Sequence, residues 1–230
     1  MPRLHFHEEL EKMELQLVTM GELAGAAVRK AVDALLEHDD AKANEVIAED
    51  DPIDELYISI DHGVLSLLAL QAPVATDLRL VSVMIHSNQH LERIGDQAVN
   101  IAKLYEVTRD LPSSPAVLQM IREMGDIVVE MVRCAMDAFR QRDLEACTRL
   151  PEMDDPVDRM NRHMHLEVAK LAEDPAALDW GMHMNMVARA LERVGDNAVD
   201  LAEQVGFLLT GEFHEFSDAS HPGTIVSDAD

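Results

Sequence analysis

The chain is poor in aromatic residues and nearly free of cysteine, and both shortages reduce the number of folds that it can adopt. Phe, Trp and Tyr make up 3% of the 230 residues although 47% are hydrophobic, so Leu, Val, Ile, Met and Ala supply the apolar volume. That composition favours packed helices. The two cysteines, Cys134 and Cys147, have no CxxC spacing. This argues against a disulfide framework and a thiolate metal site, and it fits a reducing compartment.

Basic residues and long apolar runs are also scarce. The 19 Lys and Arg residues face 44 Asp and Glu residues, for a formal net charge of −25. Such a surface repels phosphate backbones, so we expect no nucleic-acid partner and favour metal cations or basic protein patches. No apolar run approaches the roughly 20 residues that span a bilayer, and the opening MPRLHFHEEL lacks the apolar core of a secretory signal. We therefore expect a cytoplasmic protein without membrane insertion.

What the chain does contain is an internal repeat. LERIGDQAVN, residues 91–100, returns as LERVGDNAVD, residues 191–200. Upstream, MGELAGAAVRKAVDALL from Met20 aligns with MGDIVVEMVRCAMDAFR from Met124 at an offset of 104 residues. The offset then shrinks to 100, so the second copy lacks four residues, which we place at the bend before its last segment. A repeat of this length indicates two copies of one structural unit.

Apolar residues at helical spacing predict three helical segments in each copy. They cover residues 8–37, 41–70 and 74–107 in the first copy, and 115–141, 144–172 and 175–209 in the second. No alternating strand pattern competes with them. We therefore predict an all-α fold of two tandem three-helix bundles, residues 1–110 and 111–211. The polar stretch 212–230 is expected to be a disordered or loosely attached tail.

Acidic residues recur on one side of the repeated helices. At about 100° per residue, a helical wheel places the acids of LERIGD and LERVGD opposite the apolar residues. Each middle segment adds a second acidic stripe. We expect both stripes of each bundle to share one outer surface, formed by Asp50, Asp54, Glu92, Asp96 and Asn100 in the first copy and by Asp154, Asp158, Glu192, Asp196 and Asp200 in the second.

Two interpretations of these acids stay open beside metal binding. They can be plainly solvated, and Asp51-Pro52 can begin a helix, with Asp54 closing a capping-box-like contact. However, like charges four residues apart destabilise a helix by a few tenths of a kcal/mol, and both copies keep this spacing. Carboxylates from two helices are a ligand set for Mg²⁺, Mn²⁺ or iron, which would turn the repulsion into coordination.

The sequence resembles the PhoU family over about residues 8–212. The resemblance rests on LERIGDQAVNIA from Leu91, LERVGDNAVDLAEQV from Leu191 and LLALQAPVATDLR from Leu67. It implies two tandem three-helix bundles and a cytoplasmic, often homodimeric regulator that is not an enzyme. Such a protein restrains phosphate uptake and keeps the phosphate-starvation regulon off. It does so by contacting the ATPase subunit of the phosphate ABC transporter and the phosphate sensor histidine kinase.

The same resemblance implies clusters of iron, zinc or another divalent metal on the ExxxD surfaces. The implied ligands are Asp50, Asp54, Glu92 and Asp96 in the first bundle and Asp154, Asp158, Glu192 and Asp196 in the second, extended by Asn100 and Asp200. Pro52 and Pro156 depart from the pattern, because a proline can kink the helix between the acids.

Two other functional hypotheses stay open. One is a carboxylate metal-binding protein or di-metal enzyme in a helical bundle. Such enzymes usually carry paired ExxH motifs, which the repeated helices lack. The other is an adaptor that binds no metal.

Overall fold

The computed structural model describes residues 2–48, 50–70 and 73–216, and over these residues its regular secondary structure is all helix, without a β-strand. Over the same residues, no helix is both long enough and apolar enough to cross a membrane. The expected all-α fold is confirmed, whereas most of the predicted tail lies outside the described residues. The helices are α1 Pro2–Glu37, α2 Asp40–Ala48, α3 Asp51–Leu70, α4 Thr76–Thr108, α5 Pro115–Gln141, α6 Leu144–Ala169 and α7 Pro175–Thr210.

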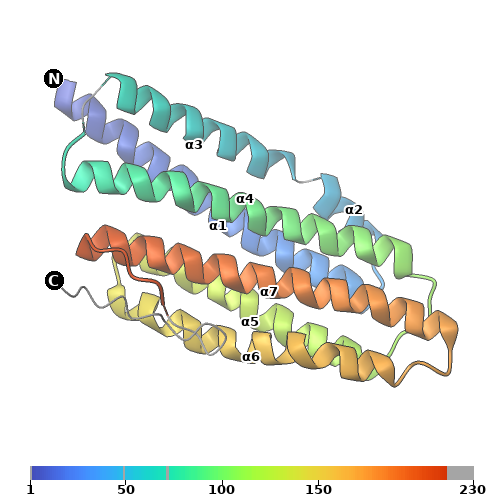
Figure 1. Cartoon of the computed structure of the whole chain (residues 1–230). Helices are drawn as coiled ribbons and strands as arrows, with labels where there is room; N and C mark the ends of the chain where they lie inside the picture. Colours follow the sequence, from blue (N-terminus) through green and yellow to red (C-terminus); the bar gives the residue numbers. More distant parts are fainter. Residues whose placement is uncertain (1, 49, 71–72, 217–230) are drawn as a thin grey trace, which may run out of the picture.

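The helices form two bundles that lie side by side. α1, α2, α3 and α4 make the first bundle, and α5, α6 and α7 make the second (Figure 1). The bundles meet where α4 packs against α7 and α1 packs against α5. Buried apolar residues form one cluster that continues through both bundles. The predicted pair of three-helix bundles is confirmed, and a shared core joins the two into one body.

Repeat-related residues begin equivalent helices. The carboxylate of Asp39 accepts a hydrogen bond from the N–H of Ala41 at 3.0 Å, before α2. Asp143, its counterpart in the second copy, accepts one from the N–H of Ala146 at 3.1 Å and caps α6. These bonds satisfy N–H groups that the first helical turn leaves unpaired. At the other end of the repeat, α7 stops at Gly211, where φ is +81°, a conformation that favours glycine.

The middle segment of the first copy is two helices, so the prediction of one helix over residues 41–70 is wrong. The carbonyl of Asp50 accepts hydrogen bonds from the N–H groups of Ile53 and Asp54, at 3.0 and 3.2 Å, and so starts α3. Pro52 lies in the first turn, where its missing N–H has no intrahelical partner to lose. This start of α3 agrees with the interpretation in which Asp51-Pro52 begins a helix.

The middle segment of the second copy is one helix although it contains two prolines. α6 runs through Pro151 and Pro156 and ends at Ala169, three residues before the predicted end at 172. Each proline removes one backbone hydrogen bond. Leu150 and Val157, next to the prolines, are fully buried. Their burial, roughly 1.5–3 kcal/mol for each large aliphatic side chain, offsets the missing bonds.

Candidate metal site

The repeated LER[IV]GD motifs lie in the middle of α4 and α7, which pack against each other where the bundles meet. Their apolar residues are buried, as the helical wheel predicted: Leu91 and Ile94 on α4 have no exposed surface. Glu92 is half-buried and Asp96 is exposed. The acids of these two helices therefore lie at the edge of the core, where acids from the middle segments can reach them.

Close helix packing explains why both copies of the motif keep a glycine. A Cβ on Gly195 would overlap the carboxylate oxygen Oδ1 of Asp154, because the two atoms would lie closer together than non-bonded atoms approach. On Gly95, a Cβ would lie 3.0 Å from Cδ1 of Ile53 and 3.9 Å from Oδ1 of Asp50. Glycine thus lets the middle segment of each copy press against the motif helix. The sequence shows that both copies keep this glycine, but only the packing of the helices reveals the reason.

Three carboxylates of the second bundle converge beside Gly195. Oxygen atoms of Asp154, Asp158 and Asp196 all lie within 4.8 Å of one another. Asp154 and Asp158 come from α6, one turn apart, and Asp196 comes from α7. In the described part of the chain this is the one place where three or more possible metal-binding side chains approach so closely.

Burial distinguishes this cluster from the solvated surface that the wheel predicted. Asp154 is 2% exposed and Asp158 9%, so the expectation that both face outward is wrong. Asp196 is exposed and gives the cluster an open side. Arg162 donates to Oδ2 of Asp158 at 3.0 Å and compensates part of the negative charge. Buried carboxylates are expensive to maintain without such compensation, and a cation would supply more of it.

The first bundle also gathers its predicted acids, but more loosely. Burial raises the pKa of Asp50 above its usual value, and the charges of Asp54 and Asp96 raise it further. Burial likewise raises the pKa of Glu92, as do Asp96 and Asp54. Lys103 partly opposes the shift at Asp50. The structure therefore brings the four acids into one electrostatic field, next to the break between α2 and α3.

The extensions of the two acidic ladders have other surroundings. Asp200 lies between the bundles, where its Oδ2 is 3.4 Å from Nδ1 of His90 on α4. Burial raises the pKa of Asp200, while His90 and Arg93 act to lower it. Asn100 is exposed, and Glu192 is half-buried one turn before Asp196. Asp200 thus helps to join α4 to α7 and lies apart from the three-carboxylate cluster.

Arg162 and Glu203 have roles that the sequence did not suggest. Arg162 follows Asp158 by four residues, a spacing that could have indicated the ion pair. Glu203 is 8% exposed on α7, and its Oε1 accepts a hydrogen bond from the N–H of Phe216 at 2.6 Å. Burial raises the pKa of Glu203 to about 7. Its position among the apolar residues of LAEQVGFLL is the only sign of this burial in the sequence.

The second-bundle cluster can hold one hard divalent cation. Three carboxylates offer oxygen ligands without sulfur or imidazole, a set that suits Mg²⁺, Mn²⁺ or Fe²⁺. The buried Asp154 and Asp158 are held in place by α6 and by the close approach to Gly195, whereas Asp196 reaches in from solvent. The donor set therefore fits a cation, with remaining ligand positions open to water or a partner.

Fold and site together define a protein of two tandem helical bundles with carboxylate clusters against the repeated helices. The family model described as the PhoU domain matches the chain twice, over residues 17–105 and 121–205. The chain belongs to the PhoU family.

Relatives and solved structures agree with this assignment. The chain is 35% identical over 207 residues to a phosphate-specific transport system accessory protein PhoU homolog of Pseudomonas aeruginosa, covering 90% of this chain and 86% of that protein. It is 32% identical over 208 residues to the homolog of Xylella fastidiosa, covering 90% and 87%.

The fold agrees as well. The crystal structure of PhoU from P. aeruginosa superposes with a TM-score of 0.86 at 34% identity, covering 90% of this chain and all of that one. The phosphate transport system regulatory protein PhoU from Streptococcus pneumoniae superposes with a TM-score of 0.82 at 26% identity, covering 91% and 99%.

Proposed function

We propose that this protein is an accessory regulator of phosphate-specific transport, without enzymatic activity. It restrains phosphate uptake and keeps the phosphate-starvation regulon off when phosphate is plentiful. The observation that carries the proposal is family membership over both bundles, because the matched relatives are named as accessory proteins of phosphate-specific transport. In this role it acts in the cytoplasm as a homodimer.

The regulator works by contact with other proteins. Its partners are the ATPase subunit of the phosphate ABC transporter and the phosphate sensor histidine kinase. A net charge of −25 supports contact with basic protein patches, since opposite charges steer association. The acid clusters against α4 and α7 add a second means of contact, because a cation bound there would leave open ligand positions for a partner.

The cation is the second element of the proposal. Asp154, Asp158 and Asp196 hold it in the second bundle, and the looser group of Asp50, Asp54, Glu92 and Asp96 does so in the first. Glu192 and Asn100, on the same two helices, extend these ligand sets, whereas Asp200 pairs with His90 and lies apart from them. Iron, zinc or another divalent metal is the cofactor. Bound metal neutralises acids whose crowding otherwise disfavours their charged state.

The proposal is tested in the source organism by alkaline phosphatase activity in excess phosphate. We expect a deletion strain to express the phosphatase and the wild-type gene in trans to silence it. A deletion strain that stays silent would contradict the regulatory role.

The partly buried cluster also supports a second candidate, a bundle protein whose main task is to bind or use metal. Two results together would favour this candidate. Deletion of the gene would leave the phosphatase silent, and the purified protein would retain stoichiometric metal. Loss of that metal in Asp154→Asn would assign it to the second bundle.

A further inference from the structure

Exposed apolar side chains follow one line along the outer side of α3. Ile58, Leu65 and Leu68 are 53%, 56% and 37% exposed. They come four, eleven and fourteen residues after Asp54, and on a helix of about 3.6 residues per turn these spacings put all four side chains on one side. A single exposed Leu is ordinary, whereas an aligned set marks a surface that contacts another molecule.

The neighbouring helix α4 continues the pattern. Leu78 and Ile85 are 48% and 40% exposed. They precede Glu92 by fourteen and seven residues, which is close to whole numbers of helical turns. The charge of Asp54 raises the pKa of Glu92, so these two acids lie near each other. The two lines of side chains therefore share one face of the first bundle.

The two helices are in register along this face. α3 and α4 run antiparallel (Figure 1), and Nδ2 of Asn88 donates a hydrogen bond to the carbonyl of Tyr57 at 3.0 Å. In the direction of the α3–α4 turn, Leu68 lies eleven residues from Tyr57 and Leu78 lies ten residues from Asn88. At about 1.5 Å per residue, both leucines are roughly 15 to 17 Å from that hydrogen bond, so they are level with each other.

We call this face the α3–α4 stripe. Its apolar half consists of Ile58, Leu65, Leu68, Leu78 and Ile85. Its acidic half consists of the four acids of the first-bundle group, Asp50, Asp54, Glu92 and Asp96. Asp61, seven residues after Asp54, adds a carboxylate within the apolar half.

The acidic half has little compensating charge. Lys103 acts to lower the pKa of Asp50, and Arg93 acts to lower that of Glu92. Within the described part of the chain, however, none of the four acids forms an ion pair. A divalent cation would neutralise two of the four carboxylates and leave the charge of the other two. This end of the stripe therefore attracts basic side chains with or without bound metal.

The second copy shows that the fold does not require the apolar half. At the positions equivalent to Ile58, Leu65, Leu68 and Ile85 it has Arg162, Ala169, Ala172 and Asn185. It keeps a leucine at the position of Leu78, as Leu178, and that side chain is half-buried. The second bundle folds in the same way without these exposed side chains, so their presence in the first bundle points to a use outside the fold.

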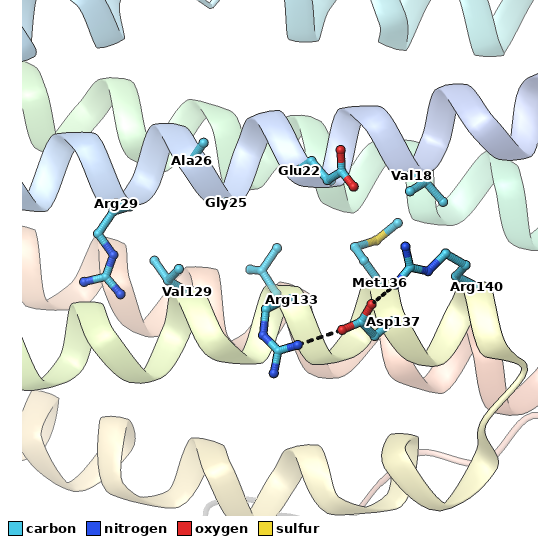
Figure 2. A pocket seen from close by; sticks show the side chains of 12 residues that line it. Val18, Glu22, Gly25, Ala26, Arg29, Val129, Arg133, Met136, Asp137 and Arg140 are labelled. Atoms are coloured by element: carbon cyan, nitrogen blue, oxygen red, sulfur yellow. Dashed lines mark hydrogen bonds and ion pairs between the residues drawn. The ribbon is translucent and has the colours of Figure 1, made fainter.

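The groove between α1 and α5 lacks this combination of exposed apolar surface and unpaired charge. Arg133 and Arg140 in its lining both pair with Asp137, as Figure 2 shows. Met136, which also lines it, is only 7% exposed. A ligand would therefore find little apolar surface in that groove and charges that are already paired.

The distribution of charge decides which occupant fits the stripe. A second copy of the chain, docked through the same face, would place carboxylates against carboxylates or against leucines. A lipid surface with anionic headgroups would repel the acidic half. Two adjacent helices with exposed apolar side chains instead suit an amphipathic helix, which packs its apolar residues between them. The acidic half adds a requirement for Lys or Arg at one end of that helix.

We propose that the α3–α4 stripe docks an amphipathic helix of a partner protein, apolar along one half of its contact face and basic along the other. The apolar half packs on Leu65, Leu68 and Leu78, and the basic half binds Asp54 and Glu92. From Leu68 to Asp54 the stripe follows α3 for roughly 21 Å at about 1.5 Å per residue, so the docked helix has about four turns. The inference deepens the proposed function and rests on it, because a regulator that acts by contact needs a docking surface.

The test uses the full chain and a labelled synthetic helical peptide of about 18 residues, or ~27 Å, which covers the stripe. Its contact face has Leu in one half and Arg in the other, with Ala and Gln elsewhere. A second peptide has Glu in place of Arg. Fluorescence anisotropy is measured near 0.15 M salt, where charges beyond about 8 Å are screened, and with EDTA to remove cations.

The test variant combines Leu65→Ala and Ile85→Ala, which remove apolar surface from the stripe. The matched control combines Leu166→Ala and Met186→Ala, at positions of the second bundle that are 51% and 58% exposed. All four changes put a strong helix former at an exposed helical position, so circular dichroism should show unchanged helicity.

We expect the wild type and the control to bind the Arg peptide saturably and with equal affinity. The test variant should bind it at least ~10-fold more weakly, which corresponds to about 1.4 kcal/mol, because a few central apolar contacts dominate such interfaces. The Glu peptide should also bind at least ~10-fold more weakly than the Arg peptide. Gln89→Glu adds a carboxylate four residues after Ile85, on the exposed side of α4, and should bind the Arg peptide at least as tightly as the wild type.

Absence of binding to the wild type, equal affinity of the test variant and the control, or tighter binding of the Glu peptide would overturn the proposal. A dimer in sedimentation that the test variant alone dissociates would overturn it in favour of a second copy. Binding to phosphatidylcholine vesicles that the test variant alone loses would overturn it in favour of a lipid surface. None of these results depends on phosphatase activity, so failure of docking and failure of the proposed regulatory role are distinguishable.

Discussion

Replacing Gly195 by Ala should separate the packing role of the repeated glycine from ordinary helix propensity. In an exposed helix, Gly→Ala stabilises by about 0.5–1 kcal/mol. Here the new Cβ would overlap the carboxylate of Asp154, a short side chain that is 2% exposed and has little room to move. Overpacking of this kind typically costs about 1–3 kcal/mol. We expect a net loss of stability of up to about 2 kcal/mol, together with a displaced Asp154 that spoils the cluster.

Gly95→Ala is the matched control, because its Cβ would meet the flexible end of Ile53 at 3.0 Å. Urea denaturation of both variants and the wild type, with and without Mn²⁺, is the assay. Gly195→Ala should have the lower midpoint and should lose most of the stabilisation by Mn²⁺, whereas Gly95→Ala should keep it. Stabilisation of Gly195→Ala like that of an exposed glycine site, or an equal response of both variants to the cation, would contradict the packing role of Gly195.

Other measurements test separate parts of the structure. Burial raises the pKa of Glu203 to about 7, above its unfolded value near 4.5. The neutral form therefore stabilises the fold at low pH, and this contribution is lost as the pH rises through 7. Glu203→Gln should flatten the fall in melting temperature between about pH 5 and 8, and an unchanged profile would contradict the assignment. Arg162→Ala removes the compensating charge at Asp158, so we expect lower stability without cation than in the wild type. The Mn²⁺-induced rise in melting temperature should be larger than in the wild type, and an equal rise would argue against a cation at this cluster. Leu17→Ala, at a fully buried position of α1, should cost about 2–5 kcal/mol in urea denaturation, and a loss below ~1 kcal/mol would show that the core there is loosely packed.

The helix pattern and the repeat could be predicted from the sequence because they depend on local periodicity. The boundaries of α5 are those predicted, since Pro115 begins the helix and the chain turns left-handed at Arg142 directly after it. The break before α3 and the continuous α6 could not both be predicted, because each middle segment contains the same Asp-Pro pair. Packing around Leu150 and Val157 decides the second case, and no local pattern reveals that packing.

The acids of the candidate site were identified by type and spacing, but their burial was not. A helical wheel gives a direction from one helix axis and does not show what a neighbouring helix covers. Asp154 lies on the flank of α6, and α7 covers it because Gly195 allows the close approach. Asp200 lies on α7 and approaches His90 of the first bundle, a long-range contact that only the assembled fold determines.

Complementation of the deletion strain tests most directly whether the second-bundle cluster is needed for repression of alkaline phosphatase in excess phosphate. The deletion strain is complemented with the wild type, with Asp154→Asn combined with Asp196→Asn, or with Gln89→Glu, and circular dichroism checks that each purified protein is helical. We predict that the folded double variant fails to silence the phosphatase, whereas the wild type and Gln89→Glu silence it. Full repression by the double variant would contradict a regulatory role for the cluster.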